Sequence, residues 1–329
     1  MKLVGMFLFV LVAATVVVDV SASKASAKCE KKPGFYYGPD SKGKMKCIKA
    51  CDAVKNEVVL FGQTFPCNST TSLVLFNAAS GVIPQSIIGL TKLTTLDLYN
   101  NKITGTIPSA LGRLTKLNYL DLSKNELTGK IPSALGRLTK LSFLHLGSNA
   151  LNGIIPSALG GLTLIDSLDL SYNQLTGTIP SSVLGGLKKL KYLYLSSTAL
   201  NGTIPSALGG LTKLYFLFLF DNELTGTIPS ALGGLTELNT LYLSYNKLNG
   251  TIPSLLGGLT SLNDLYIDDN KLTGTVPSSL GGLTMLYQLY LFGNELTGTM
   301  PDDICLIEDL DLTADCLSEV TCSCCDTCY

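Results

Sequence analysis

The amino-acid sequence predicts an α/β solenoid of about ten coils, each close to 24 residues long, with disulfide-bonded caps at its two ends. Three observations support this fold class. A template of Leu, Asn, Gly and Pro returns at a 24-residue spacing, and all ten cysteines lie outside the repeated stretch. Hydrophobic residues make up 46% of the 329 residues and charged residues only 15%, which excludes a disordered or fibrous chain. Because repeats stack in one dimension, this length does not require two globular domains.

The repeat is clearest in residues 93–108, and each of its positions has a physical reason. Leu96 and Leu98 share one face of a short strand and point inward. Asn101 lies where the chain turns, so its amide can satisfy backbone groups of its own and the neighbouring coil. Gly105 permits a tight path, and Pro108 ends the extended segment before a helical turn. We count nine good coils and one degenerate first coil; the Asn position recurs as Asn125, Asn149, Asn173, Asn222, Asn246, Asn270 and Asn294.

One coil departs from the template. It is longer by one residue around residues 181–183, and Thr198 occupies the Asn position. A hydroxyl has a single donor, whereas an amide donates twice and also accepts. We therefore expect the weakest point of the Asn ladder at Thr198.

The N-terminal residues 1–22 have the pattern of a secretory signal peptide. Lys2 precedes an apolar run over residues 3–18, and small residues follow at 20–22 and again at 25–27. The alternative is an uncleaved membrane anchor, for which the run is short beside the roughly 20 residues that a span needs. We predict a secreted, extracellular or cell-surface protein with no membrane span after cleavage. Its remaining parts are a cap region at 23–71, a solenoid at 72–304 and a second cap at 305–329.

The cysteines fall into two even-numbered groups at the ends of the stack, which in an exported protein predicts two disulfides before the repeats and three after them. Four cysteines allow three pairings and six allow fifteen, so the connectivity stays open. Zinc binding by residues 322–328 is the alternative, but no His lies nearby, and free thiolates need a reducing compartment. We predict no metal site. The two groups are Cys29, Cys47, Cys51 and Cys67, then Cys305, Cys316, Cys322, Cys324, Cys325 and Cys328.

Catalysis finds little support in the sequence. The single histidine, His145, lies on the expected concave strand face with Asp121 and Asp169 in neighbouring coils, but no nucleophile stands out. Residues 38–44 match a phosphate-binding loop until Met45 replaces the required Ser or Thr. We predict no enzyme activity and no cofactor. The formal net charge of −1 gives no sign of a nucleic-acid partner, which needs a basic stripe.

Aromatic residues at outward strand positions are the most informative feature of the later coils. They alternate with inward Leu residues, so they face the concave side. A contiguous exposed apolar patch marks an interaction site, and aromatic side chains dominate binding hot spots. The alternative is that stacked rings only stabilise the strands. The predicted binding residues are Tyr192, Tyr194, Phe216, Phe218, Phe220, Tyr242, Tyr245, Tyr266, Tyr290 and Phe292. A protein, peptide or glycan would suit this surface.

Two further patterns concern the outer surface. Thr-Gly-Thr triplets recur on successive coils, and at the strand spacing of 4.7–4.9 Å they would form a hydroxyl grid able to order water or bind ice. Lys130, Asn152, Ile154, Asn201 and Asn249 interrupt this grid. Three Asn-x-Thr triplets, at Asn68, Asn201 and Asn249, are candidate N-glycosylation sites.

The motif Leu-x-x-Asn-x-Leu-x-Gly-x-Ile-Pro-x-x-Leu-Gly-x-Leu resembles the plant-type leucine-rich repeat of receptor-kinase ectodomains and polygalacturonase-inhibiting proteins, over roughly residues 72–304. The cysteine-rich tail from Asp315 resembles the C-terminal cap of secreted leucine-rich-repeat proteins from diatoms and related algae. The N-terminal segment lacks the Trp of the plant cap. This resemblance implies a leucine-rich-repeat superhelix that recognises extracellular ligands, with inhibition of a secreted hydrolase as a narrower case. The alternative function is a structural or ice-ordering surface.

Overall fold

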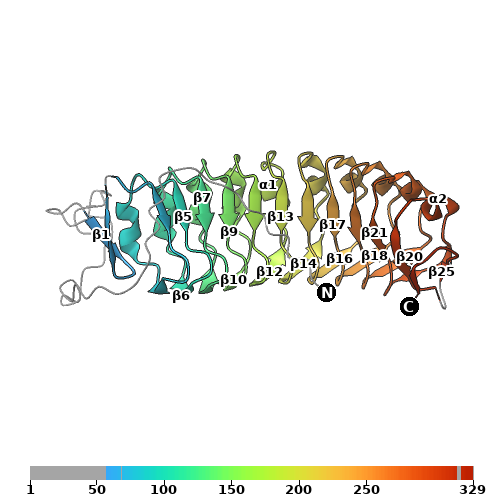
Figure 1. Cartoon of the computed structure of the whole chain (residues 1–329), viewed down its shortest axis with the longest axis horizontal. Helices are drawn as coiled ribbons and strands as arrows, with labels where there is room; N and C mark the ends of the chain where they lie inside the picture. Colours follow the sequence, from blue (N-terminus) through green and yellow to red (C-terminus); the bar gives the residue numbers. More distant parts are fainter. Residues whose placement is uncertain (1–56, 68, 317–319, 329) are drawn as a thin grey trace.

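The predicted solenoid is confirmed by a computed structural model that describes residues 57–67, 69–316 and 320–328. Coils succeed one another along one long axis, from the first coils, blue at the left of Figure 1, to the last coils, red at the right. Each coil contributes one strand to each of two parallel sheets and one short helix to the opposite edge. The proposed signal segment, residues 1–22, lies outside the described residues, as do Cys29, Cys47 and Cys51.

The first sheet has twelve strands, paired in the order in which the chain forms them. Its strands are β3 (Ser72–Val74), β5 (Thr95–Asp97), β7 (Tyr119–Asp121), β9 (Phe143–His145), β11 (Ser167–Asp169), β13 (Tyr192–Tyr194), β15 (Phe216–Phe218), β17 (Thr240–Tyr242), β19 (Asp264–Tyr266), β21 (Gln288–Tyr290), β24 (Asp311–Ala314) and β26 (Thr327–Cys328).

The second sheet has ten strands. In each coil, its strand comes directly after the turn at the template Asn position. Its strands are β4 (Ser80–Val82), β6 (Lys102–Thr106), β8 (Glu126–Lys130), β10 (Ala150–Gly153), β12 (Gln174–Thr178), β14 (Ala199–Thr203), β16 (Glu223–Gly226), β18 (Lys247–Gly250), β20 (Lys271–Gly274) and β22 (Glu295–Leu296).

Short helices return the chain to the first sheet, and each begins directly after a Pro that holds an extended conformation. The 3₁₀ helices are η2 (Gln85–Gly89), η3 (Ser109–Arg113), η4 (Ser133–Arg137), η5 (Ser157–Gly161), η6 (Ser206–Gly210), η7 (Ser230–Gly234), η8 (Ser254–Gly258) and η9 (Ser278–Gly282), and the α-helical turns are α1 (Ser181–Leu184) and α2 (Asp302–Cys305).

The two ends of the stack carry extra strands. An antiparallel hairpin of β1 (Glu57–Leu60) and β2 (Gln63–Pro66) lies at the N-terminal end, where it buries Leu60 and Phe65 against the first coil. At the C-terminal end β23 (Gly298–Thr299) pairs with β25 (Val320–Thr321). These elements cover leucine faces that no further coil would otherwise bury.

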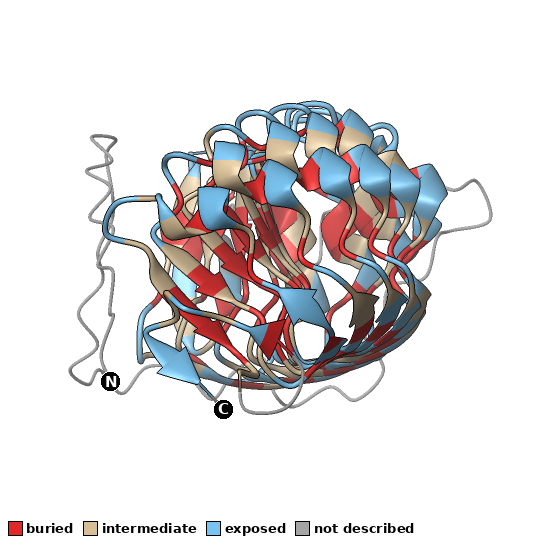
Figure 2. Cartoon of the chain, turned by 90° about the vertical axis from the view of Figure 1, so that its right-hand side faces the viewer, coloured by how far each residue is buried: buried red, intermediate tan, exposed pale blue. Residues whose placement is uncertain are grey.

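The core is a continuous column of leucines. In the end-on view of Figure 2, buried residues lie on the strands of both sheets and on the helical turns around one interior. Leu96 and Leu98 are fully buried, as are their counterparts Leu120 and Leu122 in the next coil. Burial of one such side chain contributes roughly 1.5–3 kcal/mol. Because no coil encloses its own leucines, this stabilisation exists only in the stack.

An Asn ladder joins the coils on the inside of the turn. In the coil of Asn125 the amide nitrogen donates to the carbonyl oxygens of Leu98 (2.8 Å) and Leu122 (3.1 Å), and the amide oxygen accepts the Ile103 N–H at 3.0 Å. Leu98 and Ile103 belong to the preceding coil, so each amide satisfies backbone groups of two coils. The same pattern recurs at Asn149, Asn173, Asn246, Asn270 and Asn294.

The ladder is interrupted at Thr198. The extra residue of this coil is accommodated by α1, an α-helical turn where the neighbouring coils form 3₁₀ turns. The Thr198 hydroxyl donates forward to the amide oxygen of Asn222 at 2.5 Å. Among the hydrogen bonds of the described residues, none joins Thr198 to the Leu175 N–H, which in a regular coil would donate to the Asn oxygen. Ser196, in the same coil, has the one buried side-chain oxygen of the described residues that lacks a hydrogen-bond partner.

We therefore expect Thr198→Asn to slow hydrogen exchange across residues 175–200 and to stabilise the protein by about 1–3 kcal/mol. The new amide would accept the Leu175 N–H and donate to the Leu195 carbonyl oxygen. Exchange measured by mass spectrometry, with Thr198→Val as the matched control, tests this. If the Asn variant unfolds more readily than the parent chain, the longer coil has repacked around threonine and the argument fails.

Candidate functional site

Parallel pairing in register aligns equivalent outward residues into columns across the first sheet. Along the solenoid, the central column of the concave face consists of two chemically different halves. The coils before that of Thr198 place acidic groups and the histidine there, and the coils from that of Thr198 onward place aromatic rings. In order, this column contains Asp97, Asp121, His145, Asp169, Tyr194, Phe218, Tyr242, Tyr266 and Tyr290.

The five rings from Tyr194 to Tyr290 form what we call the ring ladder. Successive centroids lie 5.1, 4.9, 3.9 and 4.8 Å apart, and most pairs meet edge to face. Such pairs are worth about 0.5–1.5 kcal/mol beyond their area. Contact is so close that Tyr266 is only 9% exposed. Tyr266 therefore supports the ladder from within it, whereas the other four residues are half-buried and remain partly exposed to solvent.

The other predicted aromatic residues surround the ladder. Phe220 lies 5.7 Å from Tyr242, and Phe292 lies 6.2 Å from Tyr290. Tyr192 and Phe216 form a second row, 5.5 Å apart, beside the ladder. Tyr245 lies at the turn, 56% exposed, with a positive φ of 55°.

Sequence reasoning missed Tyr215, which extends the second row. Its ring lies 4.8 Å from that of Phe216 and 6.3 Å from that of Tyr192, and it is 40% exposed. Tyr215 precedes the strand, so the alternation of inward and outward residues gives no signal for it. Its position beside two strand aromatics was the available clue.

Hydroxyl groups at the C-terminal end of the ladder are held by polar partners. The Tyr266 hydroxyl donates to the Gln288 side-chain oxygen, and the Tyr290 hydroxyl donates to Asp311 Oδ2 at 2.8 Å. Burial, followed by the hydrogen bond to Asp311, raises the pKa of Tyr290 to about 12. Burial likewise raises the pKa of Tyr194 and of Tyr266. These rings therefore stay neutral donors at physiological pH.

In the acidic half, Asp97 and Asp121 lie on the two strands before that of His145, and Asp169 lies on the strand after it. Burial raises the pKa of Asp97 and of Asp169 above the usual carboxyl range. Burial alone would also raise the pKa of Asp121, but hydrogen bonds from His145 and Ser123 outweigh it, so the pKa of Asp121 is lowered. The acidic half thus contains one carboxylate that favours its charge and two that resist it.

His145 bridges two polar groups in an order that resembles a Ser-His-Asp triad. His145 Nε2 lies 2.8 Å from Ser167 Oγ, and Nδ1 lies 3.6 Å from Asp121 Oδ2. Ser167 is only 3% exposed, however, and its backbone N–H donates to the Ser142 carbonyl oxygen within the sheet. An acyl transfer needs an accessible nucleophile and free donors for the oxyanion. The arrangement instead fixes the orientation of the imidazole.

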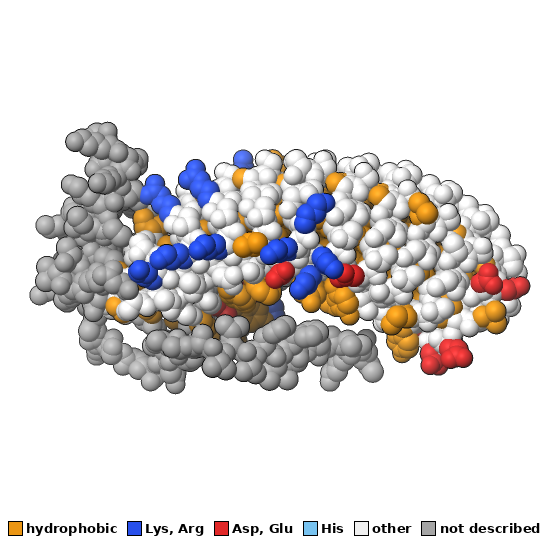
Figure 3. Space-filling view, turned by 90° about the horizontal axis from the view of Figure 1, so that it is seen from above, with side chains coloured by type: hydrophobic (Ala, Val, Ile, Leu, Met, Phe, Trp, Pro, Cys, Tyr) orange, Lys and Arg blue, Asp and Glu red, His pale blue; other side chains and the backbone are white. Residues whose placement is uncertain are grey.

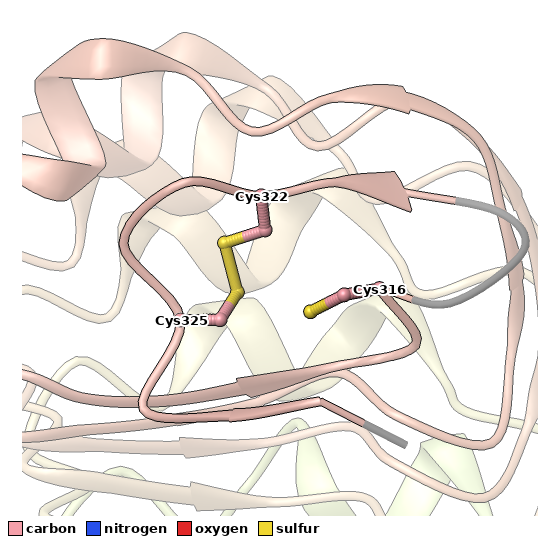
Figure 4. Close-up of side chains that lie close together, drawn as sticks. All are labelled: Cys316, Cys322 and Cys325. Carbon is pink, nitrogen blue, oxygen red and sulfur yellow. A yellow bond between two sulfur atoms is a disulfide. The ribbon is translucent and has the colours of Figure 1, made fainter.

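The six C-terminal cysteines form three disulfides, Cys305–Cys324, Cys316–Cys328 and Cys322–Cys325. Figure 4 shows the Cys316 sulfur directed toward the Cys322–Cys325 bond, and the three sulfur atoms lie within 4.8 Å of one another. Because each of these three sulfurs belongs to a disulfide, Cys316 with Cys328 and Cys322 with Cys325, none of them is a thiolate that could bind a metal. Cys67 is also disulfide-bonded. In the part of the chain that the structure describes, no helix has the length and apolarity of a membrane span.

A second regular surface lies outside the second sheet. In six successive coils, the residue after the template Gly with positive φ is Thr. We call these six exposed residues the Thr column: Thr178, Thr203, Thr227, Thr251, Thr275 and Thr299. Gly202 has a φ of +74°, and a Cβ there would lie 2.8 Å from the Thr178 methyl. Each methyl thus packs on the bare Gly of the next coil, which repeats the side-chain geometry. Two open grooves run beside this column.

The predicted glycosylation residues occupy the same side. Asn201 and Asn249 are exposed on β14 and β18. Asn68 lies outside the described residues. Their glycosylation remains a prediction.

Two charge-removing variants should act in opposite directions on stability. In Asp169 the raised pKa shows that the fold prefers the protonated acid, so ionisation costs stability as pH rises through the folded-state pKa. Asp169→Asn removes this cost and keeps an acceptor for the Ser171 N–H, so it should stabilise at pH 7. In Asp121 the lowered pKa shows that the charge is favoured; this stabilisation is present above the unfolded-state pKa of about 3.9 and is lost as pH falls through the folded-state value.

Because Asp121→Asn removes this favourable charge, the substitution should destabilise the protein at pH 7. We expect each difference to be on the order of 1 kcal/mol and to fade toward pH 3, as measured by thermal unfolding across this range. Destabilisation of similar size in both variants would contradict the distinction.

Comparisons with known proteins agree with this architecture. A family described as "Leucine-rich repeat region" matches residues 164–306, and two further leucine-rich-repeat families match residues 70–127 and 140–162. No curated protein matches significantly.

Several solved structures are similar. The Arabidopsis receptor kinase HAESA ectodomain, solved with the peptide hormone IDA, has a TM-score of 0.71 and 36% identity over 78% of this chain and 43% of its own. The plant peptide hormone receptor RGFR1, solved with RGF2, has a TM-score of 0.64 and 37% identity over 71% of this chain and 41% of its own.

This chain therefore spans less than half the length of either receptor structure. A plant ice-binding protein has a TM-score of 0.62 and 30% identity, and the match covers 71% of this chain and 77% of that one. The repeat, its register, the disulfide-bonded C-terminal end and these matches show that the chain belongs to the plant-type leucine-rich-repeat proteins.

Proposed function

We propose that the concave face binds an extracellular protein, peptide or glycan through the ring ladder, without catalysing a reaction and without a cofactor. The observation that carries this proposal is the ring ladder itself: five aromatic side chains in contact across five strands, four of them partly exposed. Rigid aromatic surfaces provide binding energy at low entropic cost. The similar receptors RGFR1 and HAESA were solved with peptide hormones, which supports a binding function.

Acidic groups set the chemistry of the ligand. Asp264 and Asp311 lie on the first sheet beside the ladder, and the buried Asp268 follows at the turn. Burial raises the pKa of Asp264 and of Asp268. A basic, partly apolar peptide or a sugar with hydroxyl donors would satisfy such acceptors. Inhibition of a secreted hydrolase is a narrower form of the same recognition.

Replacing Tyr194, Phe218 and Tyr242 together by Ser should weaken ligand binding at least tenfold, because rings near the centre of an interface each contribute about 2 kcal/mol or more. Ligands would first be selected from a displayed peptide library and a glycan array, and then titrated. A triple Leu variant preserves apolar packing if the Ser variant unfolds. Tyr119→Ser with Phe143→Ser, a ring pair 5.5 Å apart in the acidic half, is the control. Unchanged affinity in a folded triple variant would refute the proposal.

A second candidate function is favoured by the Thr column. Six exposed threonines recur at the spacing of parallel strands, about 4.8 Å, and the interruptions expected from sequence fall outside this stretch or in the neighbouring column. The similarity to a plant ice-binding protein over 77% of that chain supports the same reading. An ice-ordering surface would use these hydroxyls and methyls as a repeating lattice.

The two functions separate experimentally. Thr203→Tyr, Thr227→Tyr and Thr251→Tyr should abolish thermal hysteresis and inhibition of ice recrystallisation, because three bulky rings break the lattice. The ring-ladder triple variant should retain both activities. Absence of any ice activity in the folded parent protein would dismiss this second candidate and leave the first unaffected.

A further inference from the structure

Positive charge gathers along one edge of the solenoid, where the chain passes from a convex helix to the next strand of the first sheet. Nine of the fourteen Lys and Arg residues that the structure describes lie there, and all nine are exposed. We call this set the basic edge: Lys92, Arg113, Lys116, Arg137, Lys140, Lys188, Lys189, Lys191 and Lys213. Figure 3 shows the Lys and Arg side chains clustered over the half of this face nearer the N-terminal coils.

The basic edge is built by the repeat. Lys92, Lys116 and Lys140 occupy one template position in three successive coils, and the carbonyl–amide bonds of the adjoining residues stack those coils directly. Arg113 and Arg137 end the helices η3 and η4 and add a second row. Coil spacing near 4.8 Å makes this a linear array of cations.

Within the described part of the chain, few of these cations are paired with the acidic side chain that a purely structural role would call for. The described residues contain three ion pairs, and only Lys213, paired with Glu237, belongs to the basic edge. Lys213 and Glu237 occupy the same template position in adjacent coils. The fold therefore accepts an acidic residue at this position, where it can neutralise a neighbouring lysine. The earlier coils instead repeat lysine, and like charges on neighbouring strands are unfavourable. A row of lysines without acidic partners is explained by an anionic ligand that neutralises its positive charge.

We infer that the basic edge binds an extracellular anionic polysaccharide, a chain carrying carboxylate or sulfate groups at regular intervals. A linear polyanion can meet successive coils in register, as a compact anion cannot. Tyr215, which is 40% exposed, is the aromatic residue that follows Lys213 on this edge; single-stranded bases would need a succession of such rings to stack on. Membrane binding would pair the cations with a broad apolar face, whereas Leu164 is the one apolar residue that interrupts the lysine row. This second binding surface is separate from the ring ladder on the concave face.

Binding of the full chain to heparin and to polygalacturonate tests the inference, with dextran as the uncharged polymer. The first probe is sulfated and the second carboxylated, so their relative affinities identify the anion. Lys92→Gln, Lys116→Gln and Lys140→Gln together should lower the affinity for the preferred polymer about tenfold and flatten its salt dependence. Lys102→Gln, Lys130→Gln and Lys271→Gln remove the same charge from the second sheet and should change the affinity less than about twofold.

A gain-of-function variant makes the test independent of folding defects. Glu237→Lys extends the row by one coil and frees Lys213, so it should raise the affinity. Equal losses in the two triple variants would show that only net charge matters and would overturn the inference. Tighter binding to duplex DNA, or to vesicles rich in phosphatidylserine, than to either polysaccharide would overturn it as well.

Discussion

Every coil depends on its neighbour for two things that it cannot supply itself, a cover for its leucines and partners for the backbone at its turn. The Asn ladder supplies the second. Asn125 bonds to carbonyls of its own and the preceding coil, and its oxygen accepts an amide of that preceding coil. A one-residue slip would place each amide beside the wrong backbone groups and turn leucines to solvent. The ladder therefore fixes the register on which every surface of the molecule depends.

Fixed register converts small changes in the repeat into extended surfaces. A substitution at one template position alters one place, but the same residue type in several coils produces a column. The ring ladder, the Thr column and the basic edge all arise in this way, each on a different side of the coil. Because their residues point outward, none of them disturbs the leucine core. A single scaffold can thus present three chemistries with little conflict between folding and binding.

The fold was predictable because the template is periodic. Leucine spacing identified the strands, and the Asn and Gly positions identified the turns. Periodicity also placed all five residues of the ring ladder, since outward residues alternate with inward ones. It gave no information on contact distances, so it did not reveal that Tyr266 is enclosed by its neighbours. Nor did it reveal that His145 and Ser167, on adjacent strands, are joined by a hydrogen bond.

Other features lie beyond one-dimensional patterns. Cysteine spacing left fifteen pairings for the C-terminal group, and only the folded tail brings Cys305 to Cys324. The formal net charge of −1 concealed the basic edge, because cations on one side and carboxylates on another cancel in a sum. The sequence contained the necessary signal in lysines spaced 24 residues apart. Charge, like aromaticity, forms a pattern only when residues are compared at the same template position.

The irregular coil connects these observations. Its extra residue at α1 and its Thr198 interrupt the Asn ladder where the central column of the concave face changes from Asp169 to Tyr194. The unpartnered hydroxyl of Ser196 lies in the same coil. In a stack with nearest-neighbour coupling, a weak junction is a preferred site of local opening. Both sheets still pair in register across this junction, so the weakness is confined to the Asn ladder. The defect is tolerated where it divides two surfaces rather than within either of them.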